Sequence, residues 1–177
     1  MRRHGKGTEL RDQILKSEAR RRISETVTSS CEWAGSGLDA YSIRFEPIDH
    51  TALVASDSWV ESCYPWRSIP DWKLKDPKGF DLALWYGYEL CGLCYATPRR
   101  SRLTIKIILL EGKPGAGHAL KGLVAPLTLM AIDLYARLMN FREIEIQHPE
   151  PTAIRYYKVL GFRLDKAGRL VISVGDS

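Results

Sequence analysis

No stretch of this chain stays apolar for the roughly 20 residues that a helix needs to span a membrane. The first residues, Met1–Lys6, are mostly basic, and no apolar region of the kind found in a secretory signal follows them. Of the 177 residues, 45% are hydrophobic, which is enough for the core of one globular domain. We therefore expect a soluble protein of the cytoplasm with no membrane contact.

Cysteine is also scarce. The four residues Cys31, Cys63, Cys91 and Cys94 are too few and too scattered for the disulfide framework of a secreted domain. Cys91 and Cys94 spell C-x-x-C, but a zinc site needs two further ligands, and a redox pair stands where a strand gives way to a helix. Here the pair lies inside an apolar, strand-like run, where residues three apart are expected on opposite faces. The pattern favours two buried thiols and predicts no metal site.

The body of the chain lacks any excess of charge. Residues 1–22 hold eight basic and three acidic side chains, which accounts for the whole net charge of +5. One interpretation is contact of residues 1–22 with a nucleic acid or an acidic partner. The other is a solvated helix that covers part of the domain or mediates self-association, for example in a homodimer. The second is favoured, because the charges are not interleaved with aromatic residues.

Periodicity divides the chain into an extension and a domain. Leu10, Ile14, Ala19 and Ile23 recur at helical spacing and predict a helix over 8–28, with Thr8 as its N-cap. Serine and glycine then mark a linker, so that residues 1–38 form a basic helical extension and residues 39–177 the main domain. A strand over 41–47 and a helix over 50–63 begin this domain.

An aromatic segment follows at residues 64–72. It carries Tyr64, Trp66 and Trp72 and is interrupted by Pro65 and Pro70, so we expect no regular helix there. These aromatics either pack over the core or form the wall of a substrate pocket. They are the candidate residues for recognising an acceptor substrate.

The second half of the chain alternates strands and helices. Strands are predicted over 80–86, 90–96 and 103–111, a helix over 120–140, a strand over 142–147, a helix over 151–161 and a final hairpin over 162–174. The helical crossover makes the strands at 103–111 and 142–147 parallel, whereas the strands over 80–111 form an antiparallel meander and the chain ends as a hairpin. The sum is an α/β fold with a mixed, mainly antiparallel sheet of six or seven strands flanked by helices.

Two segments invite a phosphate-binding interpretation. Gly112 and Gly117 have the spacing of an NTPase phosphate loop, but the next residues are His118 and Ala119 rather than the required Lys and Ser or Thr, so an NTPase is rejected. The better candidate is the turn at 119–124, because the unpaired N–H groups and the dipole at a helix start attract a diphosphate. In this turn Gly122 allows close backbone approach and Lys121 supplies a cation.

The helix that follows carries a more specific pattern. Ala153 and Tyr157 are four residues apart and share a helical face, and Gly161-Phe162 ends the helix. This arrangement resembles the last motif of the GNAT superfamily of acyltransferases, and together with the turn at 119–124 it extends the resemblance over residues 41–174. In that family the tyrosine protonates the departing coenzyme-A thiolate. The resemblance implies the GNAT fold, acetyl-CoA as co-substrate and Tyr157 as general acid.

The resemblance also assigns the remaining site residues. It places the pantetheine arm of acetyl-CoA along Ile108, Leu109 and Leu110, with a backbone N–H near Leu109 or Leu110 polarising the thioester carbonyl. The other cofactor-binding residues are Ala119, Leu120, Lys121, Gly122, Leu123, Val124, Ala153 and Tyr157. In the family, the diphosphate loop begins with Gln or Arg and ends with a small residue, whereas this chain has Ala119 and Val124. Glu111, at the carboxyl end of its strand, is the candidate general base, with Glu89 and His118 as weaker options.

The function expected from this pattern is N-acetyl transfer. An amine acceptor attacks acetyl-CoA directly, and Tyr157 returns a proton to the sulfur. The alternative is a non-catalytic module of the same fold whose basic N-terminal arm binds a nucleic acid or a protein partner. Transfer of a longer acyl chain or of an aminoacyl group is a third interpretation, and the identity of the acceptor is left open.

Overall fold

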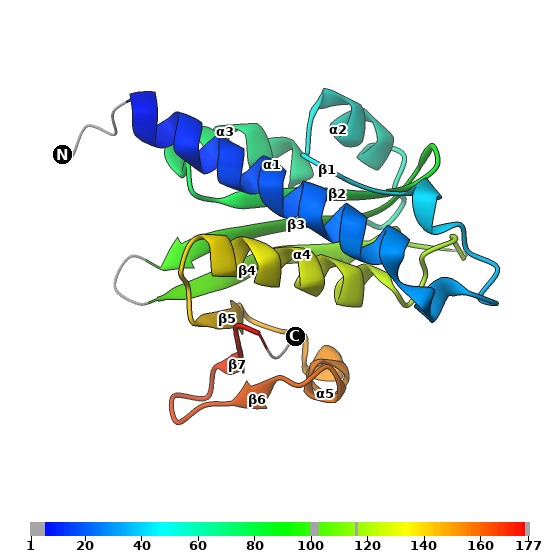
Figure 1. Cartoon of the computed structure of the whole chain (residues 1–177). Helices are drawn as coiled ribbons and strands as arrows, with labels where there is room; N and C mark the ends of the chain where they lie inside the picture. Colours follow the sequence, from blue (N-terminus) through cyan, green and yellow to red (C-terminus); the bar gives the residue numbers. More distant parts are fainter. Residues whose placement is uncertain (1–5, 100–102, 116, 176–177) are drawn as a thin grey trace.

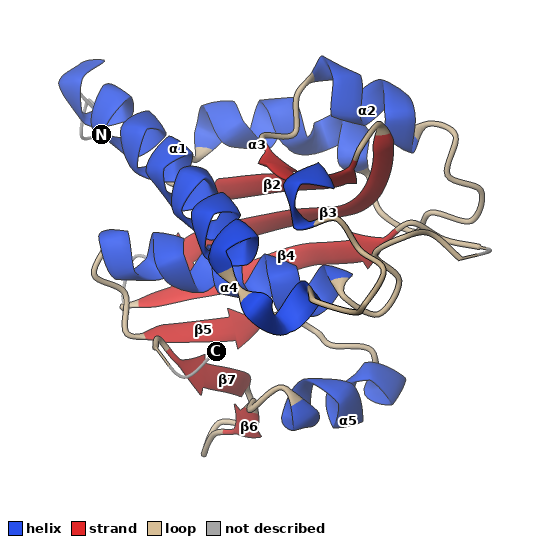
Figure 2. Ribbon diagram, turned by 45° about the vertical axis from the view of Figure 1, so that its right-hand side comes forward, coloured by secondary structure: helices blue, strands red, loops and turns tan. Residues whose placement is uncertain are grey.

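The computed structural model describes residues 6–99, 103–115 and 117–175, which form a seven-stranded sheet with helices on both faces (Figure 1, Figure 2). The strands are β1 (Ile43–Glu46), β2 (Phe80–Tyr86), β3 (Glu89–Arg99), β4 (Thr104–Gly112), β5 (Glu143–Ile146), β6 (Arg163–Leu164) and β7 (Leu170–Ser173). The helices are α1 (Lys6–Ser29), α2 (His50–Ser56), α3 (Ile69–Lys75), α4 (Val124–Leu138) and α5 (Pro151–Val159), with 3-10 turns η1 (Cys31–Trp33), η2 (Ala40–Ser42) and η3 (Trp66–Ser68).

The strand order is β1-β2-β3-β4-β5-β7-β6, and five of the six pairings between described strands are antiparallel. The exception is β4 with β5, which are parallel because α4 connects them as a crossover. The predicted fold class is therefore confirmed, including the parallel pair and the closing hairpin. Within the described residues, no helix combines the length and apolar character needed to cross a membrane.

Both faces of the sheet are buried. Alternate residues of β2 show this: Leu82 and Leu84 belong to a core under α1 and α4, whereas Ala83 and Trp85 belong to a second core under α2 and α3. Figure 2 shows α1 and α4 side by side on one face, with α2 and α3 on the other. The central strands read as continuous apolar runs for this reason.

Helix α1 packs differently from the prediction. Its predicted apolar stripe is only half right, because Leu10 and Ile14 are 63% and 58% exposed, whereas Ala19 and Ile23 are buried. The helix also begins at Lys6, so Thr8 lies within it and does not cap it. The boundary at residue 38 stays a prediction, but α1 contributes buried side chains to the same core as the sheet.

The buried face of α1 is partly polar because the sheet supplies a buried countercharge. Asp81 of β2 is 1% exposed, and its carboxylate is 3.2 Å from Arg20 Nη2 and 2.8 Å from Lys73 Nζ. Arg20 also donates to the Asp81 carbonyl at 2.7 Å, and the Ile48 N–H donates to the Asp81 carboxylate at 2.7 Å. Burial lowers the pKa of the neighbouring Lys16 amine. Asp81 thus joins α1, α3 and the sheet.

Two local expectations fail for identifiable reasons. The segment 64–72 was predicted to contain no regular helix, yet α3 begins at Ile69, because Pro70 stands in the first turn, where a missing N–H costs little. Cys91 and Cys94 were expected on opposite faces, yet both lie in the core under α4. A register shift between Leu84 and Trp85 inserts one residue into β3 at this point, which reverses the alternation. Both thiols are free and buried, as predicted.

Candidate active site

The sheet opens between β4 and β5. The two strands pair over Thr104–Ile107 and Glu143–Ile146, and the last hydrogen bond runs from the Gln147 N–H to the Ile107 carbonyl at 3.0 Å. Just beyond, Ile108 is an extra residue in β4, because Tyr95 of β3 pairs with Leu109 and Ala96 pairs with Ile107. Such a bulge bends its strand, so β4 turns away from β5 at this point. A hollow of about 120 Å³ lies here, lined by Ile108, Leu110, Tyr64, Glu150, Ala153 and Tyr157 among others.

The turn before α4 lies beside a second hollow. Gly122 has a φ of +81°, a conformation that favours glycine, and the Leu123 N–H bonds to the Leu120 carbonyl at 2.9 Å. No side chain caps the first turn of α4, whose Val124 and Ala125 line the hollow. This hollow has a volume of about 320 Å³, and its other walls include Leu110, Lys113, His118, Gly122, Tyr156 and Tyr157.

The position of this turn depends on a glycine in the neighbouring strand. A Cβ atom on Gly92 would lie 2.4 Å from Val124 Cγ1, far inside ordinary contact, so only glycine lets the start of α4 pack this closely on β3. Sequence reasoning treated Gly92 only as part of the C-x-x-C spacing. A glycine within a strand is the general signal of a close approach, but the partner was not visible in the sequence.

Tyr157 joins the two hollows, since it lines both of them together with Leu110. It projects from α5, which ends where Gly161 adopts a φ of +98°, and its ring packs edge-on against Phe162 at a centroid distance of 5.7 Å. Burial raises the pKa of Tyr157 to about 12. Its phenol therefore keeps its proton at neutral pH and is available as an acid.

Tyr156, which the sequence analysis did not select, connects α5 to the turn. Its hydroxyl donates a long hydrogen bond of 3.5 Å to the Gly122 carbonyl. The adjacent rings of Tyr156 and Tyr157 are 5.9 Å apart between centroids. One tyrosine therefore contacts the turn, while the other lies between the two hollows.

Glu111, the candidate base, is held by the loop that follows α2. Ser62 Oγ–H and Trp66 Nε1–H donate to one carboxylate oxygen at 2.8 and 2.6 Å, and the Cys63 N–H donates to the other at 3.2 Å. These bonds fix the loop 62–66 against the end of β4. They place Tyr64 at the smaller hollow, but they occupy both oxygens of the carboxylate.

Two of the three candidate acceptor contacts lie together, because the rings of Tyr64 and Trp66 pack edge-on with centroids 5.9 Å apart. Tyr64 lines the smaller hollow beside Tyr157. Trp66 is 3% exposed and packs in the core under α2 and α3, while the ring of Trp72 lies against Tyr95 with centroids 5.5 Å apart. The acceptor role stays a prediction for all three residues, and Trp66 and Trp72 also show the packing that was the other interpretation of this segment.

Some of the cofactor candidates line a hollow and others do not. Ile108, Leu110, Lys121, Gly122, Val124, Ala153 and Tyr157 line one or both hollows. Of the rest, Leu109 and Leu120 are buried, Leu123 packs against the core, and Ala119 is exposed. These four belong to the strand and turn and offer only backbone groups to a ligand. Their roles stay predictions.

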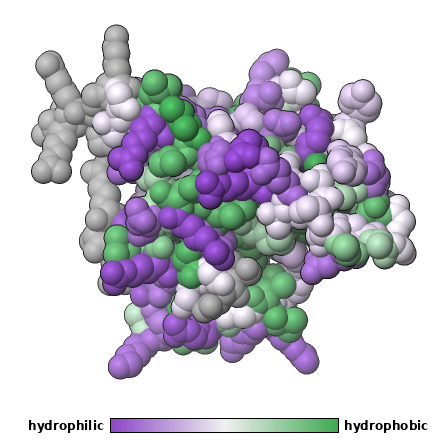
Figure 3. Space-filling view, in the orientation of Figure 1, coloured by the Kyte–Doolittle hydropathy of each residue, from purple (hydrophilic) through white to green (hydrophobic). Residues whose placement is uncertain are grey.

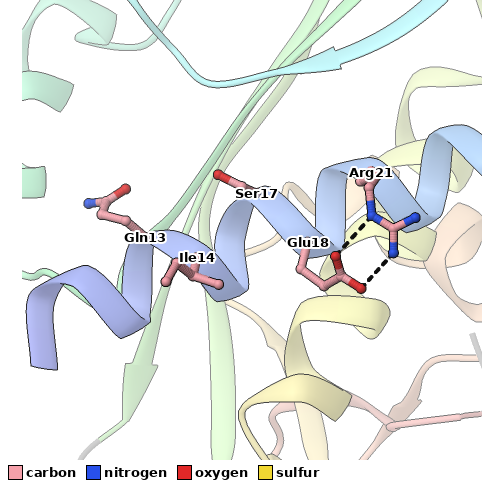
Figure 4. A pocket seen from close by; sticks show the side chains of 5 residues that line it. All are labelled: Gln13, Ile14, Ser17, Glu18 and Arg21. Carbon is pink, nitrogen blue, oxygen red and sulfur yellow. Dashed lines mark hydrogen bonds and ion pairs between the residues drawn. The ribbon is translucent and has the colours of Figure 1, made fainter. Parts of the chain in front are cut away.

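Another hollow, of about 340 Å³, lies on the outer face of α1. Figure 4 shows that all five side chains lining it, Gln13, Ile14, Ser17, Glu18 and Arg21, come from one helix. The Arg21 guanidinium donates to both Glu18 oxygens, at 2.9 and 2.7 Å. In the space-filling view, apolar and strongly hydrophilic side chains are mixed along α1 (Figure 3). No second element encloses a ligand there, and self-association through α1 stays a prediction.

Most of the described basic side chains of α1 are buried or paired, and Arg11 is exposed. Lys16 and Arg20 are buried, and the exposed Arg21 and Arg22 are paired with Glu18, as is Arg21 with Glu25. Arg2 and Arg3, also part of the predicted contact region, lie outside the described residues. Within the part of the chain that the structure describes, no group of three or more His, Cys, Asp or Glu gathers as metal ligands do.

Comparison with known proteins gives matches among solved structures. No family model matches the chain, and no curated protein matches it by sequence. Ard1 from Thermoplasma volcanium superposes with a TM-score of 0.57 at 13% identity, over 75% of this chain and 98% of that one. A Desulfovibrio desulfuricans protein described as an acetyltransferase of the GNAT family gives 0.56 at 15%, over 75% and 99%. A Bacillus subtilis acetyltransferase in complex with CoA gives 0.52 at 26%, over 70% and 78%.

Proposed function

We propose that this chain, which has the fold of the GNAT acetyltransferases, transfers an acetyl group from acetyl-CoA to an amine. The observation that carries the proposal is the position of Tyr157, which lines both the hollow at the Gly122 turn and the hollow in the gap between β4 and β5. An elongated ligand with its phosphates at the turn and its reactive end in the gap would meet this phenol. Likeness to a structure that contains CoA supports acetyl-CoA as co-substrate.

The residues present fit an anionic, extended cofactor. Lys113, His118 and Lys121 line the larger hollow together with the uncapped start of α4. Beyond Ile107, the edge of β4 that faces β5 offers backbone groups at Ile108–Leu110 for hydrogen bonding. When bound, acetyl-CoA supplies an acyl group activated as a thioester.

The chain's own groups then have separate tasks. The N–H of Leu109 or Leu110 donates to the oxygen on which negative charge develops. Tyr157 holds a proton at its phenol oxygen and gives it to the leaving thiolate, since burial keeps the phenol protonated. Glu111 stays our proposal for the base, with a proton passing through the Ser62 hydroxyl that donates to it at 2.8 Å. Positioning both reactants contributes up to roughly 7–11 kcal/mol to the acceleration.

An amine acceptor is supported by the charges near Tyr64. Burial raises the pKa of the Tyr64 phenol, and the neighbouring carboxylates of Glu111 and Glu150 raise it further. The smaller hollow is thus close to two negative charges, whereas the larger one has cationic side chains. A protonated amine is drawn to the first and a phosphate to the second.

The test combines binding and turnover. Isothermal titration with acetyl-CoA should give saturable binding, and CoA release should be followed by chromatography with a panel of polyamines, amino sugars and peptides. Tyr157→Phe should keep binding and lose roughly 100-fold or more in transfer. Tyr41→Phe, which removes the hydroxyl of a tyrosine in η2 that is 79% exposed, is the matched control, with binding and transfer near those of the wild type. Unchanged turnover of Tyr157→Phe would remove it as the acid, and absence of acetyl-CoA binding by the wild type would refute the function.

The alternative of a nucleic-acid-binding module has less support. Such binding needs unpaired cations on an open surface, and the described cations of α1 are largely buried or paired with glutamates. A salt-dependent shift of RNA or DNA by the full chain, together with no acetyl-CoA binding, would favour that module instead.

A further inference from the structure

The segment between β4 and the Gly122 turn carries two side chains that reach the larger hollow. Lys113 follows the last residue of β4, and its N–H bonds to the Cys91 carbonyl at 2.8 Å, which fixes its backbone to β3. Its amine is 2.6 Å from a carboxylate oxygen of Glu89, and both side chains are more than one-third exposed. Lys113 is therefore anchored at its backbone and held at its tip by an ion pair that a stronger anion can replace.

His118 stands at the other end of the segment and has an unsatisfied atom. Its Nδ1 is enclosed and has no hydrogen-bond partner among the described residues. Three charged groups face it: Glu89 from β3, Lys113 after β4 and Lys121 in the turn, while Tyr156 and Tyr157 of α5 line the same hollow. Burial lowers the pKa of His118, and the two lysines lower it further against the opposing effect of Glu89. An enclosed ring nitrogen without a partner is costly unless a ligand supplies one.

The charge of this hollow is one-sided. Its lining includes Lys113, His118 and Lys121 and no carboxylate, because Glu89 contacts Lys113 from outside the lining. In the family that the chain resembles, a Gln or Arg begins the diphosphate loop, and the side chain of Ala119 cannot make that contact here. A side-chain donor for the phosphates would therefore have to come from another part of the chain.

We propose that Lys113 and His118 bind the cofactor phosphates in this chain and replace the donor that Ala119 lacks. The inference rests on the proposed function and assigns two residues that the family pattern does not contain. It requires Lys113 to leave Glu89 when the cofactor binds, so Glu89 competes with the ligand. It also requires His118 to become protonated beside the added negative charge.

The experiment measures affinity by isothermal titration with CoA and with 3′-dephospho-CoA. Lys113→Ala should weaken CoA binding about 10-fold, or about 1.4 kcal/mol. Lys166→Ala, which removes an exposed lysine in the β6–β7 turn, controls for net charge and should bind like the wild type. Equal weakening toward both ligands assigns Lys113 to the diphosphate, and weakening toward CoA alone assigns it to the 3′-phosphate. Either result supports the proposal, and unchanged affinity for both ligands overturns it.

Glu89→Gln should change CoA affinity in the direction opposite to Lys113→Ala. A purely structural role of the ion pair would not produce a gain in affinity. Freeing Lys113 should tighten CoA binding roughly 3-fold. The control is Glu9→Gln, which makes the same change in net charge at the far end of α1 and should tighten binding less. Weaker binding by Glu89→Gln would contradict the competition. Because wild-type binding is measured first, its absence would refute the proposed function, whereas wild-type binding with unaffected variants would refute only this assignment.

His118 is tested by pH. With 3′-dephospho-CoA, which has no phosphate monoester titrating near pH 6, wild-type affinity should rise as the pH falls from 8 to 6, because binding favours the protonated imidazole. His118→Ala should lose this dependence and bind more weakly at pH 6. A pH dependence that persists unchanged in the variant would exclude His118.

Discussion

Gly92→Ala should misplace the start of α4 and, with it, the Gly122 turn. The new Cβ would lie 2.4 Å from Val124 Cγ1, whereas carbon atoms pack at roughly 3.5–4.0 Å, so one of the two must move by about 1 Å. A branched valine side chain, 7% exposed and fixed by its helix, cannot swing away as a lysine tip would. Overpacking of this kind costs about 1–3 kcal/mol in unfolding free energy. The same shift should weaken acetyl-CoA binding by moving the turn.

The assay is urea unfolding combined with titration of acetyl-CoA, and the structure offers two controls. Gly112→Ala faces the same valine, but its Cβ would lie 3.5 Å from Val124 Cγ2, an ordinary contact, so it should be nearly neutral. Val124→Ala removes the clashing methyl groups, so Gly92→Ala should cost less in a Val124→Ala background than in the wild type. Equal stability losses from Gly92→Ala and Gly112→Ala, or strict additivity in the double variant, would refute the argument from close approach.

Three further results are expected. Asp81→Asn should lower the free energy of unfolding by about 3 kcal/mol in urea titrations, because Arg20 and Lys73 lose their buried countercharge, whereas Asp57→Asn, which breaks an exposed pair with Arg67, should change little. Equal effects of the two substitutions would contradict this. Because burial raises the pKa of Tyr157 to about 12, the acid form is fully present below that pH, so transfer should not fall between pH 8 and 10 through loss of its proton. A loss in that range that Tyr157→Phe abolishes would show that the phenol titrates there and would contradict its raised pKa. A thiol reagent should modify Cys31 and Cys63 in the native protein and all four cysteines in urea, and fast reaction of Cys91 or Cys94 would contradict their burial.

Local signals were sufficient to predict most strands and helices. Alternation and apolar runs located β2, β3 and β4, and the helical crossover predicted the parallel pairing of β4 with β5. The errors have a common cause, which is contact between distant parts of the chain. The polar buried face of α1 depends on Asp81, which is 61 residues from Arg20, and the shared face of Cys91 and Cys94 depends on a bulge.

In the candidate site too, local features were predicted from the sequence, whereas contacts between distant segments were not. The turn around Gly122 and the position of Tyr157 were recognised from motifs, because a helix start and a helix-ending glycine are local features. The approach of Tyr156 to that turn was not predictable, since α5 meets the turn only after the sheet has formed, and the sequence did not show that the side chains of Lys113 and His118 reach the same hollow. Glu111 was selected for its place at a strand end, and its three donors come from a loop 45 to 49 residues away.

The separation of β4 from β5 after Ile107 affects how firmly the two parts of the sheet are connected. Within the described part of the sheet, β5, β7 and β6 join the first four strands through the pairing of β4 with β5, which has four residues on each side. A ligand lying in the gap would take the place of the missing strand pairing and would connect the two parts of the sheet. Amide exchange at Ile108–Leu110 and in β5 should slow when the gap is filled, so occupancy would tighten the whole C-terminal unit as well as the pocket.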